Sequence, residues 1–331
     1  MVPVSALQRF STPIQPSRTR RSLQRFLYSG LWAVQNPSEP FLSKQPPSSF
    51  DYQLYESRDG NVAPIYFLPR LGRCRGSPLL IVTGPLFHPQ VCFQTNNPTI
   101  QARREAGQDV YFITHRGHSS SNSEFCADHS FDAIVREDIP AALRVLRNKC
   151  GHTSFHWLAQ GLGGCIALMW LAQSDGNSVD KLFLLNTPLH FPRHWSRILR
   201  TVIKPFPDNL SAHHLLRLQL ALDLPISFTP EERYWLYCSS STIHKHLLEQ
   251  FLQWMNYGQL CDVDGELNYL QASSNLHNKV VLYRTNSALY GGESYPPSVQ
   301  THTSRQWFTE DCSAHFPLFS SDLSGLLSLC D

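Results

Sequence analysis

The stretch from Phe155 to Leu168 constrains the fold more than any other part of the sequence. It reads Phe-His-Trp-Leu-Ala-Gln-Gly-Leu-Gly-Gly-Cys-Ile-Ala-Leu, an apolar strand-like segment followed by a glycine-rich turn and an apolar helix-like segment. Small residues leave room for a strand to turn sharply into a helix that packs back on the same sheet. The stretch therefore predicts a strand over residues 155–159 and a helix over residues 163–172, with a tight turn around Gly161.

Segments of the same character recur on both sides of this turn. Apolar runs typical of strands buried on both faces alternate with stretches of helical spacing. Such alternation predicts an α/β fold, with a mainly parallel sheet and helices on both of its faces. The expected strands cover residues 52–57, 62–68, 78–84, 109–114 and 181–186, and the expected helices cover residues 97–106 and 131–146.

The alternation stops near Pro188. Residues 190–258 are rich in leucine, histidine, arginine and aromatic residues, with helical spacing and no clear strand, so we interpret them as an inserted helical cap. Strand-like sequence resumes at residues 280–283 and 305–309, and a last helix is expected over 318–329. Residues 51–331 are therefore expected to form one domain.

The first 50 residues have a different composition. They are basic and rich in proline and serine, with no acidic residue before Glu39 and a short amphipathic stretch over residues 22–34. Three interpretations stay open: a mobile leader that packs Trp32 on the domain, a segment that contacts a membrane surface, and an organelle-targeting segment. We expect a cytoplasmic protein, with organelle targeting or peripheral membrane contact as the alternatives.

Composition excludes several classes of function. A net charge of +2 favours neither a nucleic-acid partner nor an acidic substrate, and no apolar run reaches the roughly 18 residues of a transmembrane helix. The nine cysteines form no C-x-x-C pair and are expected to be mostly buried thiols. The pairs His213-His214 and His244-x-His246 have weak metal spacing, but no carboxylate or cysteine completes a set, so we expect no metal and no cofactor.

The order of these segments resembles the α/β-hydrolase superfamily over residues 52–330, and within it the polyhydroxyalkanoate-synthase-like and related acyl hydrolase branch. The turn at Gly161 resembles the nucleophile elbow of that superfamily, usually G-x-S-x-G. The other matching segments are residues 78–85, 107–120 with an R-G-x-x-S turn, 131–142, 186–190 and 251–269. This resemblance implies an α/β-hydrolase fold with its site at the carboxyl ends of the strands.

The resemblance also implies a nucleophile, a histidine and an acid, and this sequence fills only one of the three positions. Gly161 stands at the nucleophile position and cannot attack. His315 stands at the histidine position, and we expect it close to Gly161. The acid expected after residues 280–283 is missing, although Glu293 could substitute if its loop bends back, and the alternative acid position at Asn186-Thr187 is neutral.

An oxyanion hole is implied by the same resemblance. One donor would be the backbone N–H of Leu162, whereas the usual second donor position is Pro85, which has no N–H. The expected pocket residues are Gly84, Pro85, Leu86 and Gln160. Other side chains with reactive groups are interpreted as structural: Cys165 as a buried thiol, Ser119, Ser120 and Ser121 as turn residues, and His88 as a surface histidine.

Two functions remain open. The first is an α/β-hydrolase-fold protein without ordinary serine-hydrolase activity, which binds an acyl or other apolar ligand or a protein partner. The second is a hydrolase or acyltransferase for esters or thioesters, in which His315 acts as a base without a covalent intermediate.

Overall fold

The computed structural model describes residues 51–74, 76–85, 98–118, 121–123, 126–189, 191, 209–211, 242–273, 279–285 and 308–310. The expected leader over residues 1–50, the last helix over 318–329 and most of the cap lie outside the described residues. Within them, no helix is long and apolar enough to cross a bilayer.

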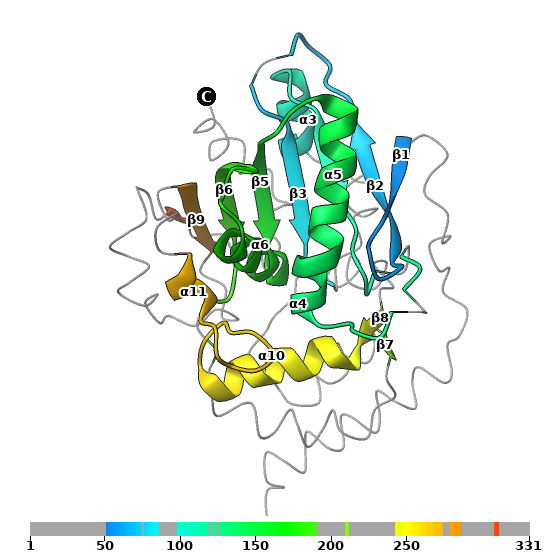
Figure 1. The fold of residues 1–331 in the computed structure, drawn as a ribbon. Coiled ribbons are helices and arrows are strands. Elements are labelled where there is room, and N and C mark those ends of the chain that lie inside the picture. The colour runs from blue at the N-terminus through cyan, green and yellow to red at the C-terminus, as the bar shows by residue number, and fades with distance from the viewer. Residues whose placement is uncertain are drawn as a thin grey trace, which may run out of the picture.

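An eight-stranded sheet forms the centre of the fold, in the order β1-β2-β4-β3-β5-β6-β9-β10 (Figure 1). The pairs β1–β2 and β2–β4 are antiparallel, and all the other neighbours are parallel. The mainly parallel sheet predicted from the alternating pattern is therefore confirmed. Its strands are β1 (Asp51–Glu56), β2 (Val62–Leu68), β3 (Leu79–Thr83), β4 (Val110–Ile113), β5 (Phe155–Gln160), β6 (Val179–Leu185), β9 (Val280–Thr285) and β10 (Phe308–Glu310).

Helices cover both faces of this sheet. The helices α5 (Ile139–Cys150) and α6 (Leu162–Gln173) lie on the near face in Figure 1, and α3 (Pro98–Glu105) lies behind the sheet. The main apolar core fills the space between the sheet and α5 and α6, where alternate residues of β5 such as Phe155 and Trp157 are fully buried. This is the period-2 arrangement in which one side of each strand faces one helical layer.

The helix expected over residues 131–146 is interrupted. It begins with α4 (Phe131–Ala133), continues as the π-helical turn η2 (Ile134–Asp138) and only then becomes α5. Pro140 at the start of α5 explains the interruption, because proline has no N–H to donate and its ring crowds the carbonyl one turn earlier. The π turn accommodates it through a bond from the Ile139 N–H to the Ile134 carbonyl.

Within the region interpreted as the cap, the structure has two short strands that the sequence did not indicate. The strands β7 (Asn209–Ser211) and β8 (Thr242–His244) pair as an antiparallel two-stranded sheet. Segments of three residues are too short to display an alternating pattern in the sequence. The helix α10 (Lys245–Tyr257) follows β8 and lies across the carboxyl ends of the parallel strands, and the short helix α11 (Tyr269–Ala272) comes next (Figure 1).

Candidate functional site

The turn between β5 and α6 lies at the carboxyl edge of the sheet. Gly161 is the N-cap of α6, with φ 56° and ψ −125°, a conformation that side-chain-bearing residues rarely adopt. A Cβ atom built at Gly161 would meet no heavy atom of the described chain within 4 Å. The sequence prediction of a strand-to-helix turn at Gly161 therefore agrees with the structure, and no described residue fills the space beside this position.

Gly163 and Gly164 are required by close packing of α6 against neighbouring segments. A Cβ at Gly163 would overlap the carbonyl oxygen of Val82 and lie 2.7 Å from the carbonyl carbon of Thr83. A Cβ at Gly164 would overlap the hydroxyl of Thr187 and lie 2.6 Å from its Cγ2. These glycines let α6 approach the backbone of β3 and the residues after β6.

The end of β3 runs against the first residue of α6. A Cβ at Gly84 would lie 3.0 Å from the Leu162 Cβ and 3.4 Å from the Leu162 nitrogen. Pro85 is buried beside it, and proline donates no hydrogen bond. Gly84 therefore lies against Leu162, with Pro85 next in the chain, whereas Leu86 and His88 lie outside the described residues.

Gln160 precedes the turn with its side chain 6% exposed. Neither its amide oxygen nor its amide nitrogen has a hydrogen-bond partner among the described residues. Unpaired buried amide groups cost free energy, about 1–3 kcal/mol each. Gln160 is therefore a buried polar group next to Gly161 in the chain, and no described residue uses the hydrogen-bonding capacity of its amide.

Two buried histidines that the sequence did not single out, His115 and His118, contact the end of β3. The His115 Nε2 lies 3.0 Å from the Thr83 carbonyl oxygen, and its Nδ1 lies 2.9 Å from that of Arg116. The His118 Nδ1 accepts the His115 backbone N–H at 3.1 Å, so its Nε2 donates to the Gly84 carbonyl, 3.2 Å away. Burial lowers the pKa of His115.

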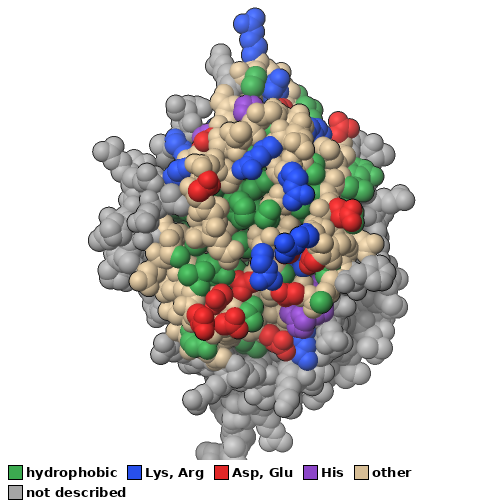
Figure 2. Space-filling view, in the orientation of Figure 1, with side chains coloured by type: hydrophobic (Ala, Val, Ile, Leu, Met, Phe, Trp, Pro, Cys, Tyr) green, Lys and Arg blue, Asp and Glu red, His purple; other side chains and the backbone are tan. Residues whose placement is uncertain are grey.

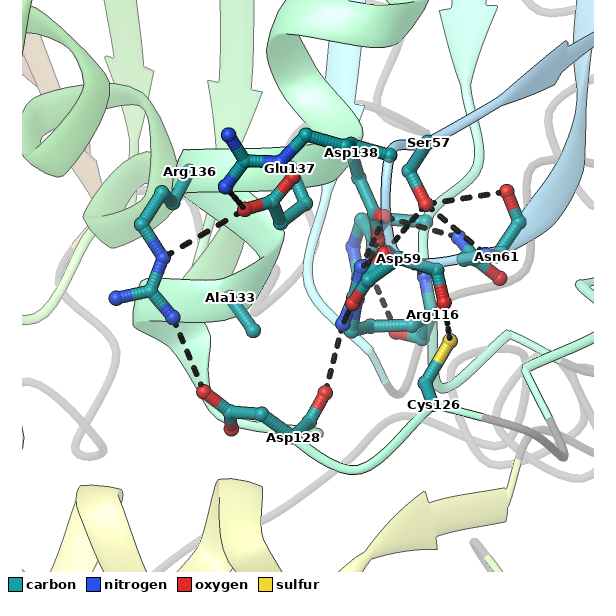
Figure 3. A network of polar contacts seen from close by, with 12 residues as sticks. Ser57, Asp59, Asn61, Arg116, Cys126, Asp128, Ala133, Arg136, Glu137 and Asp138 are labelled. Atoms are coloured by element: carbon teal, nitrogen blue, oxygen red, sulfur yellow. Dashed lines mark hydrogen bonds and ion pairs between the residues drawn. The ribbon is translucent and has the colours of Figure 1, made fainter.

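Arg116, in the turn after β4, forms the centre of a largely buried polar network (Figure 3). Its guanidinium donates to both oxygens of Asp59, to both oxygens of Asp138 and to the Asp128 carbonyl, at 2.6–3.0 Å. Asp138 also accepts the Arg116 backbone N–H and the Asn61 amide. All five N–H groups of the guanidinium are used, so this arginine joins the β4 turn to the β1–β2 turn and to η2 rather than to a ligand.

The remaining triad positions are described only in part. After β6, Asn186 has a left-handed backbone with φ 45°, and Asn186 and Thr187 are buried and neutral. His315 and Glu293 lie outside the described residues, as do Ser119, Ser120 and His213-His214. Cys165 is fully buried, as expected, and burial raises the pKa of its thiol, which makes it a poor nucleophile.

The helix α10 covers this edge of the sheet. The side chain of Leu247 comes within 3.2 Å of a Cβ built at Gly117, in the turn after β4. Gln250 holds the helix to the start of α4, because its Oε1 accepts the Phe131 N–H at 2.7 Å. Trp254 packs on the Phe131 ring, with centroids 4.6 Å apart. Across the described residues, no group of three or more histidine, cysteine or acidic side chains is placed to hold a metal ion.

Comparison with known proteins agrees with this geometry. The profile of a family described as alpha/beta hydrolase fold matches residues 78–217, which contain the turn at Gly161. No curated protein matches the chain in sequence.

Several solved structures share the fold. A carboxylesterase structure from Nitrososphaera gargenis has a TM-score of 0.58 and 15% identity, covering 84% of this chain and 97% of its own. A hydrolase from Pseudomonas aeruginosa PA01 has a TM-score of 0.59 and 14% identity, with 86% and 98% covered. The bottromycin epimerase BotH in complex with bottromycin A2 has a TM-score of 0.54 and 17% identity, with 84% and 99% covered.

The chain therefore has the α/β-hydrolase fold, and the family profile matches residues 78–217 of it. Identities of 14–17% establish the architecture and leave the reaction open, because one fold hosts many activities.

Proposed function

We propose that this chain binds an acyl or other apolar ligand at the β5–α6 turn without forming the covalent intermediate of a serine hydrolase. The observation that carries this proposal is Gly161, which has the backbone of a sharp strand-to-helix turn and no side chain, and no described atom lies within 4 Å of where its Cβ would be. An acyl-transfer nucleophile needs an oxygen, sulfur or nitrogen lone pair on a side chain, and glycine has none.

Polar groups beside Gly161 support binding of a ligand that carries a carbonyl group. The Leu162 N–H is the first of α6, and the first N–H groups of a helix have no partner within it. Together with the helix dipole, such groups attract a carbonyl or carboxylate oxygen. The unused amide of Gln160 lies next to the same position in the chain.

The triad remains part of the proposal. We assign His315 to the histidine position and Glu293 to a weak substitute for the acid, within a degenerate elbow of the polyhydroxyalkanoate-synthase-like branch. The neutral pair Asn186-Thr187 after β6 supports the absence of an acid at the alternative position. A histidine without an acid partner has no fixed tautomer and is a weaker general base.

The structural neighbours are compatible with a function other than ester hydrolysis. They include carboxylesterases and a hydrolase, and also a protein named as an epimerase in complex with bottromycin A2. The shared fold therefore carries more than one kind of chemistry, and the site must decide the activity. We further propose a cytoplasmic location, with residues 1–50 as a leader able to contact a membrane surface.

The test is turnover of a panel of activated acyl esters and thioesters by the purified full chain, beside the variants His315→Ala and His152→Ala. His152 lies after α5 and serves as the matched control. No turnover in any of the three folded proteins, with saturable binding of the neutral probe methyl decanoate, would support the proposal. Turnover that His315→Ala abolishes and His152→Ala keeps would overturn it and establish histidine-based hydrolysis or acyl transfer.

A further inference from the structure

Three histidines meet where α10 begins. The rings of His129, in the loop before α4, and His244, at the end of β8, are stacked with centroids 4.0 Å apart and an interplanar angle of 18°. The His246 ring lies 4.6 Å from that of His244 and 6.4 Å from that of His129. Histidine side chains also gather on the surface near this end of α10 (Figure 2). The cluster thus joins the cap to the loop that precedes α4.

The position of His244 requires a neutral ring. His244 is the N-cap of α10, and its Nδ1 accepts the backbone N–H of His246 at 3.3 Å. An imidazole nitrogen that accepts a hydrogen bond carries no proton, so protonation would break this cap. A positive ring would also lie at the positive end of the dipole of a 13-residue helix.

His129 suits the neutral form as well. Its Nδ1 is buried and has no hydrogen-bond partner among the described residues, so a proton there would be left unpaired. Burial lowers the pKa of His129, and the nearby charges of Arg116 and His246 lower it further, while the Cys126 backbone and Asp128 act in the opposite direction. Two stacked rings 4.0 Å apart would repel each other if both were charged.

The described charges that act on the cluster are mostly positive. Lys245 lies within the first turn of α10, and Arg116 acts on His129 from the turn after β4. Among the described residues, the carboxylate of Asp128 acts against this positive charge, and it also forms an ion pair with Arg136, at 3.3 Å. Added protons would therefore increase the positive charge of an already basic junction.

We propose that His129, His244 and His246 form an acid-sensitive latch that holds the start of α10 over the carboxyl edge of the sheet. The latch is closed when the rings are neutral and loosens when His244 and His129 take up protons. Because Leu247, three residues after His244, packs beside Gly117, loosening the start of α10 would uncover the region next to the β5–α6 turn. This role in ligand access rests on the proposed function, whereas the latch itself does not.

The geometry fixes the direction of the pH effect. A histidine whose neutral form is favoured by folding has a lower pKa in the folded chain than in the unfolded chain, whose value is about 6.5. The unfolded or opened state then takes up protons first as the pH falls. The latch is therefore fully closed above about pH 6.5 and weakens progressively below it.

Hydrogen exchange of the full chain tests the latch without any ligand. Protection of the amides of α10 is compared at pH 7.5 and pH 5.5, after correction for the intrinsic exchange rates, with the amides of α5 as the internal reference. We expect α10 to lose about tenfold more protection than α5 on acidification, the size of an N-cap removed. His244→Asn keeps an N-cap acceptor that does not titrate, so it should abolish most of this extra loss.

Two further variants make the outcome decisive. His129→Phe keeps a stacked ring without titration and should reduce the extra loss, whereas His152→Asn, outside the cluster, should behave as the original chain. An unchanged difference between α10 and α5 in the original chain, or an extra loss retained in His244→Asn, would overturn the latch. Binding of methyl decanoate at pH 7.5 is a separate measurement, so its failure would overturn the ligand function and leave the latch standing.

Discussion

Two glycines of the β5–α6 turn, Gly161 and Gly163, should tolerate substitution very differently, although only one residue separates them. Alanine at position 163 would place its Cβ 2.7 Å and 2.9 Å from the carbonyl carbon and Cα of Thr83, on a central buried strand. Backbone atoms there cannot move aside without shifting the sheet. We expect Gly163→Ala to destabilise the fold by roughly 3 kcal/mol or more, at or above the usual cost of overpacking.

Gly161→Ala should cost less, because its Cβ would enter open space. The remaining penalty is conformational, since φ is 56° and ψ is −125°, and such strain costs about 1–3 kcal/mol. Gly151 provides a matched control: it ends α5 with φ 70° and also has no described atom within 4 Å of a built Cβ. Gly151→Ala therefore measures the cost of a positive φ alone, about 1 kcal/mol.

Equilibrium unfolding in urea is the assay, with stability changes taken from the midpoint at unchanged slope. The expected order of destabilisation is Gly163→Ala, then Gly161→Ala, then Gly151→Ala. If Gly161→Ala were as damaging as Gly163→Ala, the space at the turn would be filled, and the open position on which the proposed function depends would not exist. A mild effect of Gly163→Ala would contradict the close approach of α6 to β3.

Three further predictions concern chemistry and charge. Gly161→Ser should restore little or no ester hydrolysis in a chromogenic assay, because the triad that we propose lacks its usual acid as well. Robust turnover would reveal a substitute acid. Asp138→Asn should lower the free energy of unfolding in urea by about 3–5 kcal/mol, because it breaks a fully buried ion pair with Arg116. Asp59→Asn should lower it by about 1 kcal/mol, because Asp59 is partly exposed. Equal losses would contradict this difference between the buried and the exposed ion pair. Burial alone would raise the pKa of Asp59, but hydrogen bonds from Arg116 and Ser57 lower it from 3.8 to about 2. The stabilisation that the Asp59 carboxylate provides is therefore complete above pH 3.8 and is lost as the pH falls toward about 2. Asp59→Asn should remove this loss from the curve of stability against pH.

The strands of the parallel sheet were the most predictable part of the fold. Runs such as residues 78–84 are apolar on both faces, and only a strand covered by helices on both sides buries such a run completely. The turn at Gly161 was predictable for a related reason, because a glycine-rich segment between an apolar strand and an apolar helix has few other solutions. Both features depend on local sequence.

The features that the sequence did not reveal depend on distant partners. The strands β7 and β8 pair across more than thirty residues, and neither has enough length to show a pattern. The stretch from His115 to His118 has the composition of an exposed loop, yet His115, Arg116 and His118 are buried, because Asp59, Asp138 and the carbonyls of β3 satisfy their polar groups. Burial of polar side chains is decided by such partners and not by residue type.

The glycines at positions 163 and 164 separate the fold of this turn from its chemistry. Each is required by the approach of α6 to a neighbouring backbone or side chain, whatever residue stands at position 161. A chain can therefore keep a well-formed strand-to-helix turn, with the N-terminus of α6 beside an open position, and have no nucleophile there. The turn is therefore evidence for the packing of α6 on the sheet and not for an activity. Activity must be tested at Gly161 itself rather than inferred from the glycines around it.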